Sequence, residues 1–153
     1  MDLSFKVEGL DKLDKASKAV AAEIAKQVEI GLYASAKKVE GDAKRSIMQG
    51  SKSGRLYQRR TVTHRASAPG EAPANDTGRL VNSINSYLVK AEKYATVTAG
   101  RGLAMYARAL EFGTAKMAAR PFFFAAAEKN RQWISARLSQ AVRDAISKTT
   151  KGK

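Results

Sequence analysis

The residues with the most chemical potential in this sequence are a histidine, a serine and a glutamate that stand close together. His64, Ser67 and Glu71 carry the imidazole, hydroxyl and carboxylate groups that nucleophilic catalysis uses. Their spacing matches neither a nucleophile elbow nor a known order of triad residues, and His64 stands between Thr63 and Arg65. We therefore interpret His64 as a solvated loop residue and rank a small hydrolase last among the functions considered.

Glu111 is the second candidate for acid–base chemistry. It precedes Phe112 near the end of a short apolar segment, and this position predicts partial burial. A carboxylate at a helix end commonly pairs with a cation, so we expect an ion pair with Arg108 or Arg120 rather than a role in proton transfer.

The composition excludes several kinds of site. The 153 residues include no cysteine and one histidine, so a disulfide framework, a thiolate nucleophile and a metal site with two imidazoles are excluded. The Gly-Arg-Gly at 100–102 is too short to cradle a phosphate. We expect no cofactor, no metal and no enzymatic activity. No apolar run approaches the roughly 18 residues of a membrane-spanning helix, so we expect no membrane partner.

Positive charge dominates the sequence and is concentrated in one stretch. The chain carries 28 Lys and Arg against 14 Asp and Glu, a net charge of +14. Residues 43–70 contain no acidic residue, and their cations are Lys44, Arg45, Lys52, Arg55, Arg59, Arg60 and Arg65. Such a block fits either a solvated loop or a surface that faces a polyanion or an acidic protein. The sequence leaves both interpretations open.

A short strand and a long helix are predicted at the start of the chain. Residues 3–7 alternate between apolar and polar types, which predicts a half-buried strand. Apolar residues then recur every three or four positions over about 11–48, which predicts one long amphipathic helix. Gly31 and Gly41 are its expected bend points, because glycine is a poor helix former.

Residues 49–77 are rich in Gly and Pro and have no sustained periodicity, which predicts an irregular basic arm. An unstructured stretch of this length is uncommon inside a compact domain, so we expect an arm that becomes ordered on assembly. Tyr57, Val62 and the arginines around them are also compatible with a flexible hairpin that packs on a partner.

The centre of the chain predicts a short helix followed by a hairpin. Cap and turn chemistry predicts a short helix from Thr77 or Gly78 to about Ser83, with Leu80 and Ile84 facing inward. Residues 84–90 and 94–99 read as strands, and the connection of three residues between them predicts antiparallel pairing.

Two further helices complete the predicted elements. Residues 103–112 form a weak apolar helix with Gly113 as its C-terminal cap. Pro121 is expected at the first position of a final helix that ends near residue 148, before a basic tail over 149–153.

The predicted fold class is α+β. Long N-terminal and C-terminal helices pack on a small antiparallel β-sheet in a single domain over 1–148, with 49–77 as a long basic loop. Three consecutive phenylalanines, 122–124, open the last helix. Consecutive helix residues point in different directions, so at least one of the three rings is expected to face outward or into a partner.

Three segments in a fixed order resemble a known viral family. The first joins Pro-Gly-Glu-Ala-Pro at 69–73 to Thr-Gly-Arg-Leu-Val-Asn-Ser-Ile at 77–84. The second is Tyr-Ala-Arg-Ala-Leu-Glu-Phe-Gly-Thr at 106–114, and the third is Arg-Pro-Phe-Phe-Phe-Ala-Ala-Ala at 120–127. This order resembles the neck or tail-completion family of long-tailed bacteriophages, described as minor tail components, whose members open with a short strand and a long amphipathic helix.

The resemblance implies a structural, non-enzymatic protein of the virion. Such proteins form a ring, a hexamer or a dodecamer, at the head–tail junction or upper tail, where they join or close the tail around the DNA channel. The implied partners are head-completion or adaptor proteins, tail-terminator or tail-tube proteins, and genomic DNA through nonspecific contacts. Assembly would take place in the host cytoplasm. Phe124 and Ala125 replace the more usual Leu/Arg-Pro of the family, so we expect a softer bend after the phenylalanines.

Two groups of residues are expected to make the contacts. The expected oligomer or partner contacts are Tyr57, Arg79, Phe112, Phe122 and Phe123. The expected contacts to DNA in the channel or to an acidic partner are Lys52, Arg55, Arg59, Arg60 and Arg65. The alternative function is a nonspecific nucleic-acid-binding protein, which explains the net charge equally well but leaves the segments at 106–114 and 120–127 unexplained.

Overall fold

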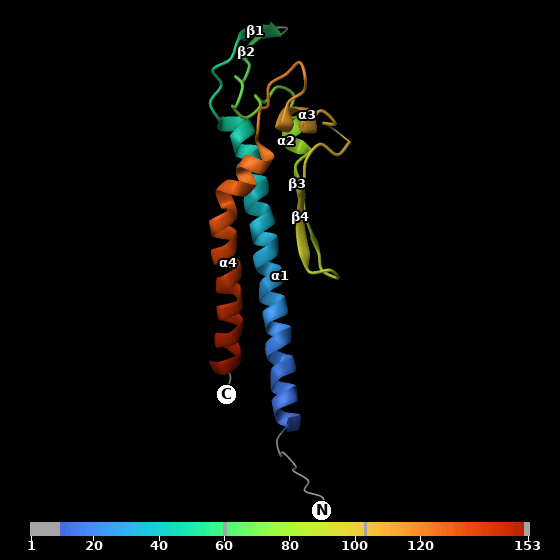
Figure 1. The fold of residues 1–153 in the computed structure, drawn as a ribbon, viewed down its shortest axis with the longest axis vertical. Helices are drawn as coiled ribbons and strands as arrows, with labels where there is room; N and C mark the ends of the chain where they lie inside the picture. Colours follow the sequence, from blue (N-terminus) through green and yellow to red (C-terminus); the bar gives the residue numbers. More distant parts are fainter. Residues whose placement is uncertain (1–9, 60, 103, 152–153) are drawn as a thin grey trace, which may run out of the picture.

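The computed structural model of the chain describes residues 10–59, 61–102 and 104–151 (Figure 1). The strand predicted over 3–7 lies outside the described residues. In chain order the elements are α1 (Leu10–Gln49), β1 (Leu56–Arg59), β2 (Val62–Arg65), α2 (Arg79–Asn82), β3 (Asn85–Val89), β4 (Tyr94–Thr98), α3 (Ala107–Phe112) and α4 (Phe123–Lys151).

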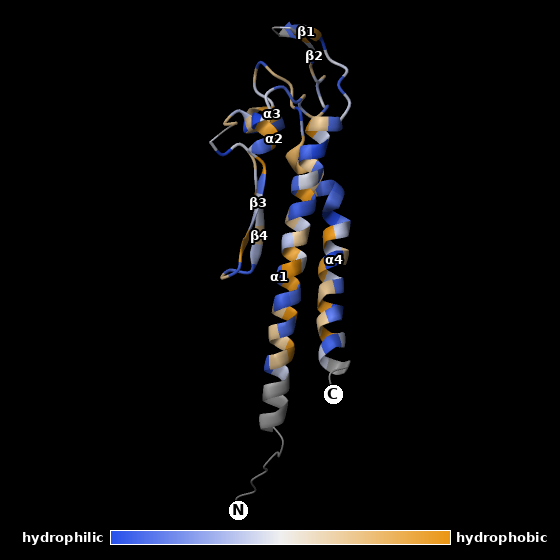
Figure 2. Ribbon diagram, turned by 180° about the vertical axis from the view of Figure 1, so that it is seen from behind, coloured by the Kyte–Doolittle hydropathy of each residue, from blue (hydrophilic) through white to orange (hydrophobic). Residues whose placement is uncertain are grey.

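The helices α1 and α4 form a long antiparallel pair that is the axis of the molecule (Figure 1). α1 has 40 residues and therefore extends over about 60 Å. Hydrophobic residues are interspersed with hydrophilic ones along both helices (Figure 2). The predicted α+β layout, with long terminal helices beside small antiparallel hairpins, is confirmed.

Small residues bring the two long helices close together. A Cβ atom added at Gly31 would lie 3.1 Å from Leu138 Cδ2 and 3.5 Å from Ala141 Cβ. Ala141 and Ala145 are themselves fully buried. α1 runs without interruption through Gly31 and Gly41. Neither glycine breaks the helix, and Gly31 serves instead to let α4 approach.

One polar contact fixes how α1 and α4 are aligned. The Asn130 side chain, which is buried, donates a hydrogen bond of 2.7 Å from its Nδ2 to Asp42 Oδ2. This bond lowers the pKa of the Asp42 carboxyl, although partial burial works in the opposite direction. Asn130 Nδ2 also donates to Ala126 O within α4 at 2.8 Å, and sliding one helix along the other would break only the bond to Asp42.

The hairpin formed by β3 and β4 lies along α1 (Figure 1). Its pairing is antiparallel, as predicted, with Tyr87 opposite Thr96. Glu40 of α1 ties it down, because one Glu40 oxygen accepts a 2.6 Å hydrogen bond from Ser86 Oγ. Burial alone would raise the pKa of Glu40, but hydrogen bonds from Lys44, Ser86 and Lys37 hold that pKa at about 2.

The hydrophobic core lies where α1, α2 and the start of α4 meet. Leu80 and Ile84 are buried, which confirms that they face inward. Small and branched side chains predominate around one large ring, and the cluster contains Val39, Ala43, Ile47, Leu80, Val81, Ile84, Ala104, Ala107, Phe122 and Ala126.

Several element boundaries differ from the predictions. α4 begins two residues after Pro121, and it continues to Lys151, through the first residues of the predicted tail. α3 begins only at Ala107, and it ends at Gly113, whose φ of 75° is a conformation that suits glycine, as predicted. The arm over 49–77 is not irregular throughout, because it contains the hairpin β1–β2, with Tyr57 and Val62 in its strands as the hairpin interpretation predicted.

Replacement of Gly31 by leucine tests the close approach of the helices. We expect Gly31→Leu to lower the free energy of unfolding by about 1–3 kcal/mol, because the new side chain collides with Leu138 and Ala141. The matched control is Gly41→Leu, where an added Cβ meets only the end of the Arg45 side chain at 3.7 Å. The control should be neutral or stabilising by up to about 1 kcal/mol, because leucine is the better helix former. Equal effects of the two variants in urea denaturation would contradict the assignment.

The low pKa of Glu40 predicts how stability depends on pH. Because the pKa of Glu40 falls from 4.5 to about 2 on folding, its stabilisation is complete above pH 4.5 and is lost as the pH falls through 2. Glu40→Gln should therefore be less stable than the wild type at neutral pH, and the difference should shrink as the pH falls below about 4.5. Unfolding free energies measured at a series of pH values check this, and a difference independent of pH would refute it.

Candidate interaction surfaces

Glu111 joins the second and third segments of the viral resemblance. Its side chain, 8% exposed, lies at the N-terminus of α4. Oε2 accepts hydrogen bonds from the backbone N–H groups of Phe122 at 2.9 Å and Phe123 at 3.0 Å, and Oε1 accepts one from Phe124 at 2.9 Å. A negative charge at this end also interacts favourably with the helix dipole. The predicted partners Arg108 and Arg120 are therefore wrong, since backbone donors hold the carboxylate.

The first segment is tied to the same place. The backbone N–H of Arg120 donates to Leu110 O at 2.7 Å, and its guanidinium donates twice to Ser67 O at 3.3 Å. Gly70 N donates to Ala119 O at 2.9 Å. Stretches of chain that are far apart in sequence thus meet at the end of the molecule from which α4 starts (Figure 1).

The run of phenylalanines divides between the core and the surface. Phe122 is 1% exposed and is a core residue, so the expectation that it contacts a partner is wrong. Phe123 is partly buried against the core. Phe124 is 58% exposed and Phe112 is 64% exposed, with their ring centroids 5.6 Å apart. These two residues, the aromatic pair, form an exposed apolar surface, and the partner contact expected of Phe112 stays a prediction. Phe124 was missed because residue spacing alone does not say which ring of a run points outward.

The base of the β1–β2 hairpin is held by Glu71. Its carboxylate accepts hydrogen bonds from Ser53 Oγ at 2.7 Å, Ser53 N at 2.9 Å and Ala68 N at 2.8 Å. These donors, with the Ser53 hydroxyl foremost, lower the pKa of Glu71 to about 2. Glu71 therefore has a structural role. Its three hydrogen bonds join Ser53, before the hairpin, to Ala68, after it.

Lys52 also has a structural place. Its Nζ donates to Ala72 O at 3.0 Å and to Ser46 O at 3.3 Å. Partial burial lowers the pKa of Lys52, and the negative charge of Glu71 opposes that effect. The ammonium group of Lys52 bonds to backbone carbonyls and so stabilises the loop. It is therefore less accessible to DNA or an acidic partner, the contact expected of Lys52, than a solvated lysine would be.

The hairpin itself presents cations and apolar side chains to solvent. Arg55 and Arg65 are exposed, and Leu56 and Val62 are exposed beside them. The described residues do not include Arg60 or the side chain of Arg59, so their expected contacts are not tested. The hairpin stands at one end of the molecule, beyond the start of α4 (Figure 1).

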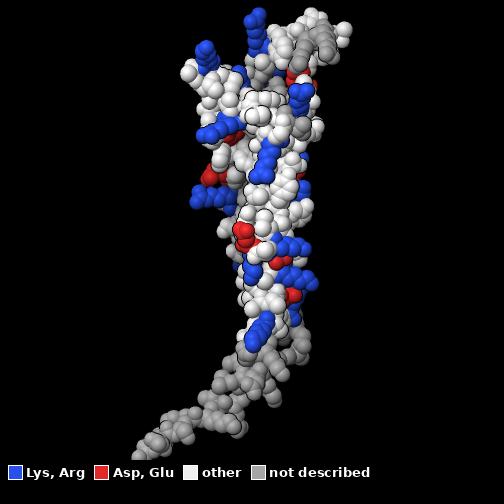
Figure 3. Space-filling model, turned by 90° about the vertical axis from the view of Figure 1, so that its right-hand side faces the viewer, with Lys and Arg blue, Asp and Glu red and all other residues white. Residues whose placement is uncertain are grey.

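The basic block of the sequence is divided in three dimensions. Lys44 pairs with Glu40 at 2.6 Å, and Arg45 pairs with Asp42 at 3.2 Å, so these two cations belong to α1. Lys and Arg side chains are spread along the length of the face drawn in Figure 3 rather than gathered in one patch. The cations of residues 43–70 are therefore divided between α1 and the β1–β2 arm.

His64 is not a free loop residue. Its ring stacks on Tyr57, the residue opposite it in the hairpin, with centroids 5.8 Å apart. His64 Nε2 lies 3.7 Å from Asp76 Oδ1. This arrangement connects the hairpin to the turn before α2, a contact between distant residues that no local pattern predicts.

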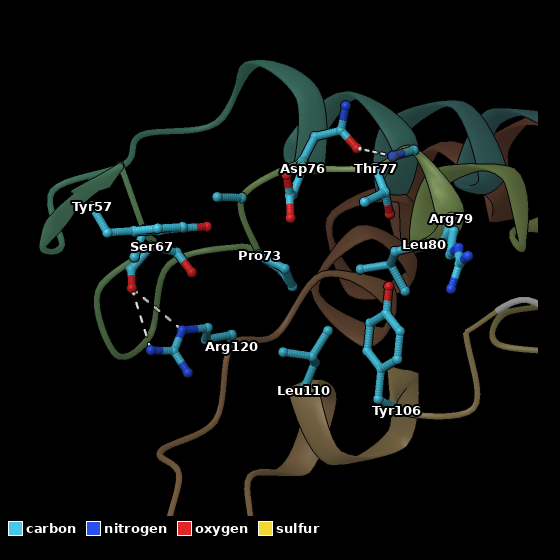
Figure 4. A pocket seen from close by; sticks show the side chains of 14 residues that line it. Tyr57, Ser67, Pro73, Asp76, Thr77, Arg79, Leu80, Tyr106, Leu110 and Arg120 are labelled. Carbon is cyan, nitrogen blue, oxygen red and sulfur yellow. Dashed lines mark hydrogen bonds between the residues drawn. The ribbon is translucent and has the colours of Figure 1, made fainter. Parts of the chain in front are cut away.

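A cavity of about 270 Å³ opens between the hairpin, α2 and α3 (Figure 4). Tyr57 and Ser67 lie on one side of it, and Arg79 and Tyr106 lie on the other. Tyr57 and Arg79, both expected contacts, thus border the same hollow. The Arg120 guanidinium bonds to Ser67 O at its edge.

Neither a metal-binding cluster nor a membrane-spanning helix is present in the part of the chain that the structure describes. No cluster of three or more His, Cys, Asp or Glu side chains there could hold a metal ion. No helix among the same residues is long and apolar enough to cross a membrane.

No protein-family model, curated protein or solved structure matches the chain.

Removal of the Glu111 carboxylate tests its capping role. We expect Glu111→Ala to lower the free energy of unfolding by about 1–3 kcal/mol, because three buried or partly buried N–H groups lose their acceptor. Glu111→Gln should cost less, since the amide oxygen still accepts a hydrogen bond but the charge at the helix end is gone. Urea denaturation measures both.

The matched control is Glu128→Ala, which removes a carboxylate of α4 that is 74% exposed. Its effect should stay within about 0.5 kcal/mol. A Glu111→Ala variant as stable as this control would show that the cap contributes nothing.

Proposed function

We propose that this chain is a structural protein of a tailed bacteriophage. In this proposal it forms a ring at the head–tail interface, the neck or the completed end of the tail, and joins or closes the tail around the DNA channel. The observation that carries the proposal is the meeting of the three resembling segments at one end of the molecule. There, Glu111 and Arg120 tie the second segment to the third, Gly70 of the first segment donates to Ala119 O beside the third, and the aromatic pair and the hairpin are left exposed.

Assembly into a ring would give the exposed aromatic pair a role as a contact between subunits. Subunits of a closed ring meet through two different complementary surfaces, so each subunit must expose apolar side chains that a neighbour covers. Phe112 and Phe124, at 64% and 58% exposed, are more accessible than large aromatic side chains usually are in a monomer. The proposal assigns the aromatic pair to a contact with an adjacent subunit or a neighbouring virion protein.

The hairpin supports a contact of a second kind. Arg55 and Arg65 stand on it with Leu56 and Val62, a mixture that suits either phosphate groups in the channel or an acidic protein surface. The alternative proposal, a nonspecific nucleic-acid-binding protein, rests on the same two arginines. It gives no role to the aromatic pair, and for this reason we favour the ring.

A phage whose copy of this gene is deleted provides the test. We expect its particles to carry unattached or unstable tails, with infectivity restored by the wild-type gene supplied from a plasmid. The double variant Phe112→Ser, Phe124→Ser should restore at least tenfold less infectivity although the isolated variant folds with a nearly unchanged melting temperature, since both rings are exposed.

The matched control is Ile146→Ser, an exposed apolar residue of α4 outside the aromatic pair, which should restore infectivity fully. Deleted particles with firmly attached, infectious tails would reject the proposal. Tight binding of duplex DNA by the isolated chain, with a steep loss of affinity as salt is raised, would favour the nucleic-acid-binding alternative.

A further inference from the structure

An apolar groove lies beside the exposed edge of β3, far from the aromatic pair. It encloses about 420 Å³, and its apolar wall is made by Ile30, Tyr33 and Ala34 of α1 with Leu88 of β3. Ile30 is 46% exposed and Tyr33 is 44% exposed. Among the described residues β3 pairs only with β4, so its other edge has unused backbone donors and acceptors. A groove beside an open edge accommodates an added strand.

The chain itself contains a segment of matching chemistry. Leu3, Phe5 and Val7 alternate with Ser4, Lys6 and Glu8, so in an extended conformation the three apolar side chains share one face. That face matches the apolar wall of the groove, and the backbone of such a strand matches the open edge of β3.

The charged side chains of the segment do not enter the groove. Asp2, Lys6 and Glu8 alternate with the apolar residues, so in an extended conformation they share the opposite face, which a strand added to β3 turns away from the groove.

Length decides whether the segment comes from the same copy. Along α1, the 20 residues from Leu10 to Ile30 rise about 30 Å. Phe5 stands only five residues before Leu10, and even a fully extended chain that turns back carries it about 17 Å. The segment therefore falls short of the centre of its own groove, and a second copy must supply it.

We infer that residues 3–7 of one copy add as a strand to the edge of β3 in a neighbouring copy, with Leu3, Phe5 and Val7 in the groove beside Ile30 and Tyr33. This inference deepens the proposed function and rests on it, because the neighbour is the adjacent subunit of the ring. The exchange gives each subunit two different surfaces, a donated strand and an accepting groove, as a closed ring requires.

Disulfide trapping tests the exchange directly, because the chain has no cysteine of its own. One tagged copy carries Phe5→Cys, and a second copy with a different tag carries Ile30→Cys. The control replaces the second copy with Ile146→Cys, since Ile146 and Ile30 are both 46% exposed. The mixtures are oxidised at the highest soluble concentration and, separately, in assembled particles. We expect the doubly tagged dimer to be at least tenfold more abundant with Ile30→Cys than with Ile146→Cys.

Several results overturn the inference. One is equal yields from the two pairs, or no mixed dimer in either preparation. Another is a disulfide within single copies that carry both Phe5→Cys and Ile30→Cys, formed in dilute solution. Rings seen by electron microscopy in particles that lack the mixed disulfide would reject the exchange and leave the proposed function standing. Infectious particles that need no copy of this chain would remove both.

A variant without cysteines gives an independent reading. Phe5→Asp places a charge on the apolar face of the segment, and we expect it to weaken self-association at least tenfold in sedimentation experiments. Lys6→Asn, on the opposite face of the same segment, should weaken it far less. Equal behaviour of these two variants would also count against the strand exchange.

Discussion

The start of α4 depends on a carboxylate that comes from another helix. The first N–H groups of a helix have no partner within it, and here Glu111 of α3 accepts from three of them. This contact sets the direction in which α4 leaves the end of the molecule, and so it sets where Phe122 enters the core and where Phe124 emerges. The cap thus lies beside both a core ring, Phe122, and an exposed ring, Phe124, while the pairing of α4 with α1 rests on contacts farther along the two helices.

The same principle holds at the other anchoring points. Glu40 accepts from Ser86, Lys37 and Lys44, and Glu71 accepts from Ser53 and Ala68, so buried or loop-closing anions receive several donors each. In this chain, with its large excess of positive charge, these carboxylates each accept several hydrogen bonds and so hold different segments together. The cations left over, such as Arg55 and Arg65, are at the surface and available to a partner.

The shape of the molecule is suited to assembly. Its core is small and rich in alanine, and the α1–α4 pair is long and narrow, so a large share of apolar side chains is left uncovered. The aromatic pair lies at one end, and the groove beside β3 lies part of the way along α1. The proposed ring would use two such separate surfaces, because subunits of a closed ring meet through different patches.

The sequence by itself determined the elements whose causes are local. Periodicity predicted α1 and α4, alternation and a short connection predicted β3–β4, and glycine chemistry predicted the end of α3 at Gly113. It also predicted that one phenylalanine of the run faces outward. The predicted start of α4 at Pro121 was two residues early, and the carboxylate that caps the observed start comes from elsewhere in the chain.

Only the tertiary structure decided the contacts between segments distant in sequence. It decided that Glu111 caps α4, that Lys52 turns toward backbone carbonyls, and that His64 stacks on Tyr57. It also decided that Phe122 is buried while Phe124 is exposed. Local pattern fixes the type of an element, but which side chain meets which partner depends on how the elements approach in space.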